Sequence, residues 1–296
     1  NNMIGHIAAK ERTDIFEKSG YVPWQPAFET FGISYHNKLQ PPATDLDGIV
    51  ADFYEISRAD FKKDSLMTIP DGCTDFMFVS NGSQLRSYVS AGVRTNKEFY
   101  FGEAEFLFGI RFMPGGTYRV FPDPIRELVH HPIPLSCIMH NTDILLEQFF
   151  ACQSFAQRVE LLSDYVRANL RQRETRYEIL NGLSRMIYTC HGNVTIEMLS
   201  EQLGYSARYL QELCNDYIGI SPKEFCQTVR MQYALALEQK NPQAALAVLA
   251  SMAGYADLSH MNREFKKYMS CKLSDIKKNK IRKSGQMMEQ IVFPVG

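Results

Sequence analysis

Two copies of one short motif carry the strongest structural signal in the chain: Leu199-Ser200-Glu201-Gln202-Leu203-Gly204-Tyr205-Ser206 and, 50 residues later, Leu249-Ala250-Ser251-Met252-Ala253-Gly254-Tyr255-Ala256. Each copy predicts a short helix, a turn at the glycine and a second helix, over Ser206–Tyr217 in the first copy and Asp257–Tyr268 in the second. Glycine suits the turn because it adopts positive φ at little cost. A helix-turn-helix has this pattern, and its second helix enters the major groove of DNA.

Each predicted second helix has an apolar face and a polar face. Leu210, Leu213 and Tyr217 share one side of the first, and Met261, Phe265 and Tyr268 one side of the second. The polar faces carry side chains that hydrogen-bond base edges or phosphates. The candidate DNA-binding residues are Arg208, Gln211, Glu212, Asn215, Ser259, Asn262, Arg263 and Lys266. A solvated helix surface has the same polarity, but the repetition of the whole arrangement favours DNA reading.

A longer helix is predicted between the two copies. It begins at Ser221-Pro222, with Ser as N-cap and Pro in the first turn, and ends at Asn241-Pro242. At about 1.5 Å per residue it is roughly 25 Å long. Together with the bodies of the two motifs, this length is compatible with recognition helices placed about 34 Å apart, which is one turn of DNA.

These residues resemble the DNA-binding domain of the AraC/XylS family of bacterial transcription regulators. The resemblance covers about residues 176–283, and its carriers are Gly219-Ile220-Ser221-Pro222-Lys223-Glu224-Phe225 and, after Gly254-Tyr255, the run Asp257–Tyr268. Two positions depart from the family pattern. Met261 stands where Phe is usual, and Ser270-Cys271-Lys272-Leu273-Ser274 replaces a Gly-x-Ser/Thr-Pro stretch. The resemblance implies a sequence-specific regulator that binds double-stranded promoter DNA, with RNA polymerase as a further partner.

The charge distribution predicts two domains. The net charge of the chain is −1, but the first 175 residues carry 17 Lys and Arg against 22 Asp and Glu, whereas residues 176–286 carry 15 against 10. A basic C-terminal half suits contact with phosphates. The polar run Arg171–Arg176 is the predicted linker, so we expect a sensing domain over residues 1–172 and a DNA-binding domain over residues 177–283.

The N-terminal half predicts short strands separated by Pro and Gly turns, which is typical of a β-sandwich or barrel. The predicted strands are Gly48–Ile56, Thr74–Ser80, Ser87–Val93 and Glu105–Met113. Two helices follow, over Thr142–Phe150 and Phe155–Leu170. The predicted fold class is therefore α+β: a β-barrel, then an all-α domain with two helix-turn-helix motifs joined by a linker helix.

The N-terminal half also resembles the cupin-like domains of some AraC-type regulators, through Ile69–Phe76 and Phe108–Gly116. This resemblance implies control by an unidentified small-molecule effector, and dimerisation in some members. If Glu105–Met113 is a strand, Arg111 and Gly109 share one face, and the glycine leaves room for a ligand beside the arginine. Arg111 is thus the candidate effector-binding residue, with pairing to a carboxylate as the alternative.

An enzyme is the competing function class. The seven His residues are scattered, and neither a Gly-x-Ser-x-Gly elbow nor a phosphate-binding glycine loop is present. We therefore expect no catalytic residues, no metal site and no cofactor. A cupin-like small-molecule-binding protein, or a regulator controlled by abundance or by protein partners, stays an alternative. The absence of a signal peptide and of a membrane-spanning run predicts a cytoplasmic protein with no membrane contact.

Overall fold

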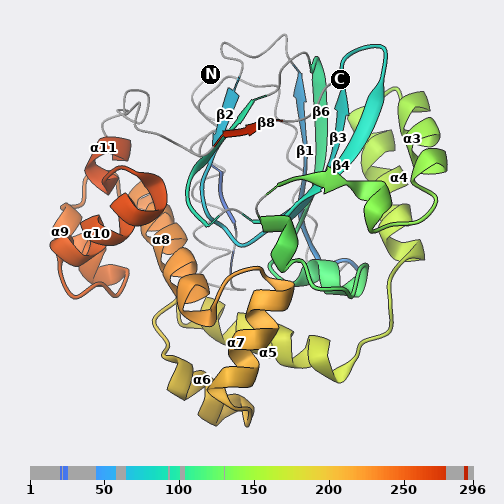
Figure 1. Cartoon of the computed structure of the whole chain (residues 1–296). Coiled ribbons are helices and arrows are strands. Elements are labelled where there is room, and N and C mark those ends of the chain that lie inside the picture. Colours follow the sequence, from blue (N-terminus) through green and yellow to red (C-terminus); the bar gives the residue numbers. More distant parts are fainter. Residues whose placement is uncertain are drawn as a thin grey trace.

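The computed structural model describes residues 21, 23–25, 45–57, 65–92, 94–100, 104–129, 131–277 and 290–292. Apart from β8 (Gln290–Val292), the described strands lie before residue 135 and the described α-helices after residue 141 (Figure 1). The α+β class predicted from the sequence is confirmed. Residues 278–283 of the predicted DNA-binding domain lie outside the described part.

The larger sheet has five antiparallel strands in the order β1-β6-β3-β4-β7. Their bounds are Val50–Ser57 for β1, Thr74–Ser80 for β3, Leu85–Ser90 for β4, Phe106–Phe112 for β6 and Ile133–Pro134 for β7. The predicted strand over Thr74–Ser80 is confirmed at both ends, and β1, β4 and β6 lie within a few residues of their predicted positions. Apolar and aromatic residues between Pro and Gly turns located these strands correctly, because β3 and β6 are buried on both faces.

The sheet is open, which corrects the expectation of a closed barrel. A second sheet of three strands, in the order β2-β5-β8, is formed by Ser65–Thr68, Lys97–Tyr100 and Gln290–Val292. At one edge of the larger sheet, β7 is only two residues long and ends at Pro134. Proline has no backbone N–H to continue a ladder, so the sheet stops there.

Two helices cover one face of the larger sheet: α3 (Thr142–Ala151) and α4 (Phe155–Ala168), visible beside β3, β4 and β6 in Figure 1. Phe149 of α3 stacks on Phe78 of β3 with ring centroids 4.6 Å apart. Apolar residues of both helices belong to the core, since Leu145, Val159, Leu162 and Val166 are buried there. Three short 3-10 helices lie between β6 and α3: Gly116–Arg119, Arg126–Val129 (η3) and Leu135–Cys137.

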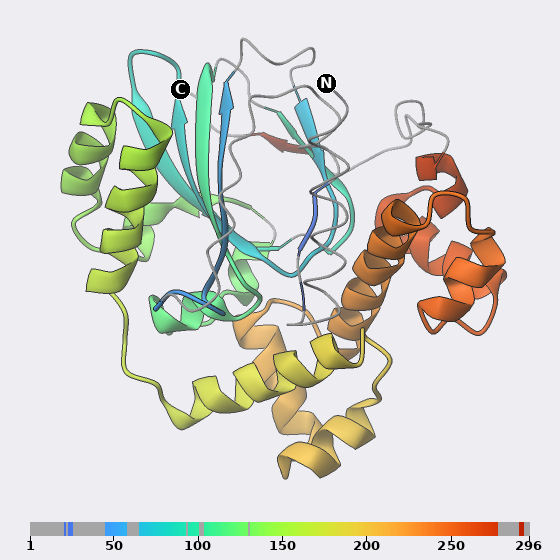
Figure 2. The ribbon, with the colours of Figure 1, turned by 180° about the vertical axis from the view of Figure 1, so that it is seen from behind.

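The C-terminal half contains two small helical units on either side of one long helix, α8 (Pro222–Lys240), as Figure 2 shows from behind. The bounds of the others are α5 Thr175–Thr189, α6 Ile196–Leu203, α7 Ala207–Tyr217, α9 Leu246–Met252, α10 Leu258–Met269 and α11 Leu273–Lys277. The helices predicted over Ser206–Tyr217 and Asp257–Tyr268 therefore lie within a residue of α7 and α10.

The two halves of the chain pack against each other through a common apolar cluster. Tyr21 stacks on Tyr188 of α5 with ring centroids 4.9 Å apart, and Tyr118 meets Tyr217 of α7 edge to face at 4.6 Å. In the same contact, the buried amide of Gln232 in α8 donates to the backbone oxygens of Trp24 and Pro70. The helical half is thus held by residues from well before the linker.

Candidate nucleic-acid interface

The first helix-turn-helix is built from α6, a turn at Gly204 and α7. The hydroxyl of Thr195 accepts a hydrogen bond from the Met198 N–H at 3.3 Å, and that of Ser206 accepts from Tyr209 N–H at 3.2 Å. Both residues are therefore N-caps. Gly204 ends α6 in the left-handed conformation, with φ of 74°. The angle between the two helices is thus fixed by local sequence.

The second helix-turn-helix repeats this construction with α9, Gly254 and α10. Asp257 caps α10, because its carboxylate accepts the His260 N–H at 2.6 Å. Gly254 has φ of 82°. Met261, which replaces the usual Phe of the family, is fully buried together with Phe265, so this substitution keeps the apolar face intact.

The structure places the predicted DNA-binding residues on the outer faces of α7 and α10. On α7, Arg208, Gln211 and Glu212 are exposed and Asn215 is half-buried; on α10, Ser259, Arg263 and Lys266 are exposed and Asn262 is half-buried. Arg208 Nε lies 3.1 Å from Glu212 Oε1, with the arginine side chain 90% exposed. Two separate polar faces are thus available, one from each unit.

A buried ion pair attaches α10 to α8, and the sequence analysis did not identify it. Arg230 of α8 donates to Glu264 of α10 at 2.6 Å, and only 5% of the Glu264 side chain is exposed. The same guanidinium lies over the ring of Tyr255, 4.9 Å from its centroid, and His260 Nε2 is 3.5 Å from Glu264. The available signal was the position of Glu264, next to Phe265 and three residues after Met261 on the apolar side of the helix.

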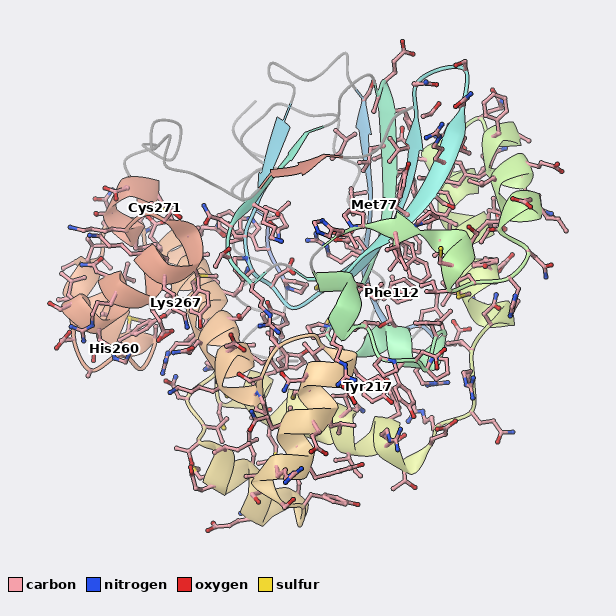
Figure 3. All side chains as sticks on the ribbon, in the orientation of Figure 1. Met77, Phe112, Tyr217, His260, Lys267 and Cys271 are labelled. Atoms are coloured by element: carbon pink, nitrogen blue, oxygen red, sulfur yellow. The ribbon has the colours of Figure 1, made fainter. Side chains whose placement is uncertain are left out.

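The end of α9 is positioned by a contact that the sequence analysis did not identify. Figure 3 labels His260, Lys267 and Cys271 in this second unit, on the side of the molecule away from α3 and α4. The amide of Asn193, in the loop before α6, donates to the Ala253 oxygen at 3.1 Å. This contact joins the turn of the second unit to the loop that enters the first.

Arg111, the candidate effector-binding residue, is buried on β6. Its side chain lies on the face opposite Phe108, which contacts Phe149 of α3. Its guanidinium lies 3.0 Å from Asp71 and 2.9 Å from Asp75. Burial lowers the pKa of Arg111, but the two carboxylates outweigh it and the net shift is upward. The room expected above Gly109 is filled by the ring of Tyr54, which a Cβ at that position would overlap. Arg111 is therefore paired, as in the alternative considered from the sequence.

Within the ranges that the structure describes, no three His, Cys, Asp or Glu residues lie close enough together to hold a metal ion. No helix of this part is long and apolar enough to cross a bilayer. All seven cysteines are free thiols, and Cys73, Cys214, Cys226 and Cys271 are buried.

Comparison with known proteins identifies two segments. Residues 199–279 match the family model described as a helix-turn-helix domain. Residues 38–134 match a second model, described as a domain of unknown function, DUF6597. None of the curated proteins matches the chain. The resemblance to the AraC/XylS family is confirmed for the C-terminal half.

Among solved structures, the chain is similar to ToxT from Vibrio cholerae. An unsaturated fatty acid bound wild-type form from strain SCE256 is 12% identical, with a TM-score of 0.39, over 80% of this chain and 96% of that one. A 1.65 Å structure of ToxT from Vibrio cholerae is 13% identical, with a TM-score of 0.38, over 76% and 96%. The identification of a DNA-binding region in this chain rests on the helix-turn-helix match over residues 199–279, and not on these structures.

Proposed function

We propose that this chain, a DNA-binding transcription regulator of the AraC type rather than an enzyme, reads two successive major grooves of a promoter with α7 and α10. The observation that carries the proposal is the pair of exposed polar faces on two helix-turn-helix units joined by one helix. At about 1.5 Å per residue, α8 spans roughly 28 Å, which suits two grooves about 34 Å apart. RNA polymerase is the expected partner at the promoter.

The side chains on these faces match the chemistry of base edges. Arg208 and Arg263 suit guanine, which offers two acceptors to a guanidinium, and Gln211, Asn215 and Asn262 suit adenine. Glu212 suits the amino group of cytosine, whereas Ser259 and Lys266 suit either bases or phosphates. The excess of basic residues over residues 176–286 adds an attraction that does not depend on sequence.

The test is the salt dependence of binding by the full chain to duplexes selected from a random library. The affinity of wild type should fall steeply as salt rises, because phosphate contacts release counterions. The double variant R208A/R263A should lose most of its preference for the selected duplexes. Arg167→Ala, which removes an exposed arginine of α4 that pairs with Asp45 and Asp164, is the matched control and should bind like wild type. A wild type with no salt-dependent binding to any duplex would overturn the proposal.

The N-terminal domain is the proposed sensor of a small-molecule effector. We propose that Arg111 binds the effector, on the face of the five-stranded sheet opposite α3 and α4. Because Asp71 and Asp75 already hold the guanidinium, an anionic effector must displace one of these carboxylates to reach it. Thermal stability measured across a ligand library tests this, since a ligand at 100 times its Kd adds about 2.7 kcal/mol.

A homodimer formed through α3 is also proposed. Ile144 and Phe150 are more than half exposed, and a shallow groove of about 360 Å³ lies between α3 and α4, lined by Gln148, Ala151, Cys152, Gln157, Glu160, Leu161 and Asp164. Sedimentation should show a dimer that Phe150→Ser weakens. A wild type that stays monomeric at high concentration, with and without DNA, would exclude the dimer.

A further inference from the structure

The last carbonyl groups of a helix have no partner within that helix and must be satisfied from elsewhere. At the end of α10, the N-terminal domain satisfies two of them. The backbone N–H of Asn96 donates to the Tyr268 oxygen at 2.8 Å, and the Asn96 amide Nδ2 donates to the Met269 oxygen at 3.2 Å. The second recognition helix is therefore held at its C-terminal end by a residue that lies more than 170 positions earlier in the chain.

The end of the first unit is held from the same domain. The Ile125 N–H donates to the Asp216 oxygen at 2.7 Å, and Arg126 forms an ion pair with the Asp216 carboxylate at 3.0 Å. Beyond α7, Arg94 Nη2 donates to the Gly219 oxygen at 2.9 Å. Arg94 and Asn96 are two residues apart, so one short segment before β5 contacts the exits of both recognition helices.

The hydrogen bond from Arg94 to Gly219 places this segment beside the start of α8. Burial raises the pKa of the Glu224 carboxyl, but hydrogen bonds from Ser221 and the nearby charges of Arg94 and Lys267 outweigh it, and the net shift is downward. The charges of Arg94, from the N-terminal domain, and of Lys267, from α10, thus act on the same carboxyl. The segment lies at the junction of α7, α8 and α10.

Ser270 connects this junction to a departure from the family pattern. It ends α10 in the left-handed conformation, with φ of 56°, where the AraC/XylS pattern has glycine. A side chain at positive φ is strained. The Ser270 hydroxyl, which a glycine lacks, donates to Asn96 Oδ1 at 3.1 Å. The strained residue thus supplies a third hydrogen bond to Asn96.

We infer that Arg94 and Asn96 are positioning residues for DNA reading, through which the N-terminal domain sets the orientation of each recognition helix separately. Asn96, with Ser270, holds α10, and Arg94 holds the exit of α7. This inference rests on the proposed two-groove reading of DNA. It requires that neighbouring substitutions in one segment affect different halves of the binding site.

The experiment measures base preference at every position of the selected duplex, with the full chain. The half-site of α7 is defined as the one that changes in Arg208→Ala, and that of α10 as the one that changes in Arg263→Ala. Asn96→Ala should weaken base discrimination about threefold to tenfold in the α10 half-site and leave the other unchanged, and Arg94→Gln should do the reverse. Asn81→Ala is the matched control, because it removes three hydrogen bonds in the turn between β3 and β4.

Ser270→Gly provides a second variant that relieves backbone strain and therefore folds. It should relax preference in the α10 half-site alone, and the double variant N96A/S270G should be no worse than N96A, because the two residues act through one contact. Unchanged base preference in these variants, or an equal change in both half-sites, would overturn the inference while leaving the proposed function intact. A wild type that selects no duplex would instead overturn the proposed function.

Discussion

Gly204 and Gly254 occupy equivalent turns, yet they differ in what surrounds them. Both have positive φ, but a Cβ at Gly204 would meet nothing within 4 Å, whereas one at Gly254 would lie 2.2 Å from the Asn193 amide oxygen. Glycine at 204 is thus required by backbone conformation alone. At 254 it is also required by the contact between the two helix-turn-helix units.

We predict that Gly204→Ala costs about 1–2 kcal/mol of unfolding free energy, the price of a left-handed alanine. Gly254→Ala should cost clearly more, because Asn193 must also move from the Ala253 oxygen. Urea denaturation of the two variants measures the difference. Equal costs would show that the Asn193 contact contributes nothing to stability.

The ion pair between Arg230 and Glu264 predicts a large effect from a single substitution. Arg230→Met removes the arginine partner of the buried Glu264 carboxylate, which should cost about 3–5 kcal/mol. The double variant R230M/E264L should recover much of that loss, because the buried charge is also removed. Arg208→Met breaks an exposed pair and should cost less than about 1 kcal/mol. Denaturant unfolding checks all three, and an R230M variant as stable as R208M would contradict the prediction.

Among the helices, α3 and α4 were predicted within about two residues at each end, and the helices of the C-terminal half were located through the signals at their ends. Ser206 and Asp257 are N-caps in the structure, and Pro222 begins α8 as expected, so α7, α8 and α10 were located within a residue or two. The arrangement of the N-terminal strands could not be predicted in the same way. Apolar runs between turn residues show where strands lie, but they do not show whether the sheet closes.

Contacts between segments that are distant in the chain also could not be predicted from the sequence. Neither the partners of Asn193 and Asn96 nor the geometry of their contacts follows from the local sequence pattern. The polar faces of α7 and α10 could be predicted because the helical period alone assigns them. The residues that orient those faces could not, because they come from other elements.

The first turn of α8 predicts a pH-dependent contribution to stability. Ser221 and Glu224 form a capping box in which each side chain bonds the backbone of the other, and the pKa of Glu224 is lowered in the folded state. Its contribution should therefore be present at neutral pH and disappear as the pH falls through the folded pKa. Glu224→Gln, which can keep the capping box but removes the charge, should be less stable than wild type at pH 7. The two proteins should converge in acid, and a constant difference across the titration would contradict the assignment.

At the scale of the whole molecule, the two halves are separate in sequence but share packing. Tyr21 and Trp24 lie in one buried cluster with residues of α5 and α8. A fragment of residues 176–283 should bind duplex DNA with steep salt dependence. It should unfold at a lower temperature than the full chain, because Tyr188 loses its contact with Tyr21 and Gln232 loses its hydrogen bond to Trp24. Calorimetry of the fragment and the full chain measures this. A fragment that unfolds at the same temperature would show that the shared cluster adds no stability.

The central claim is that one chain reads two successive major grooves, one with each recognition helix. Base preference measured position by position for wild type, Arg208→Ala and Arg263→Ala tests it most directly. The account predicts two blocks of preference about ten base pairs apart, with Arg208→Ala erasing positions in one block and Arg263→Ala in the other. A single block, or two blocks that both variants weaken equally, would contradict it.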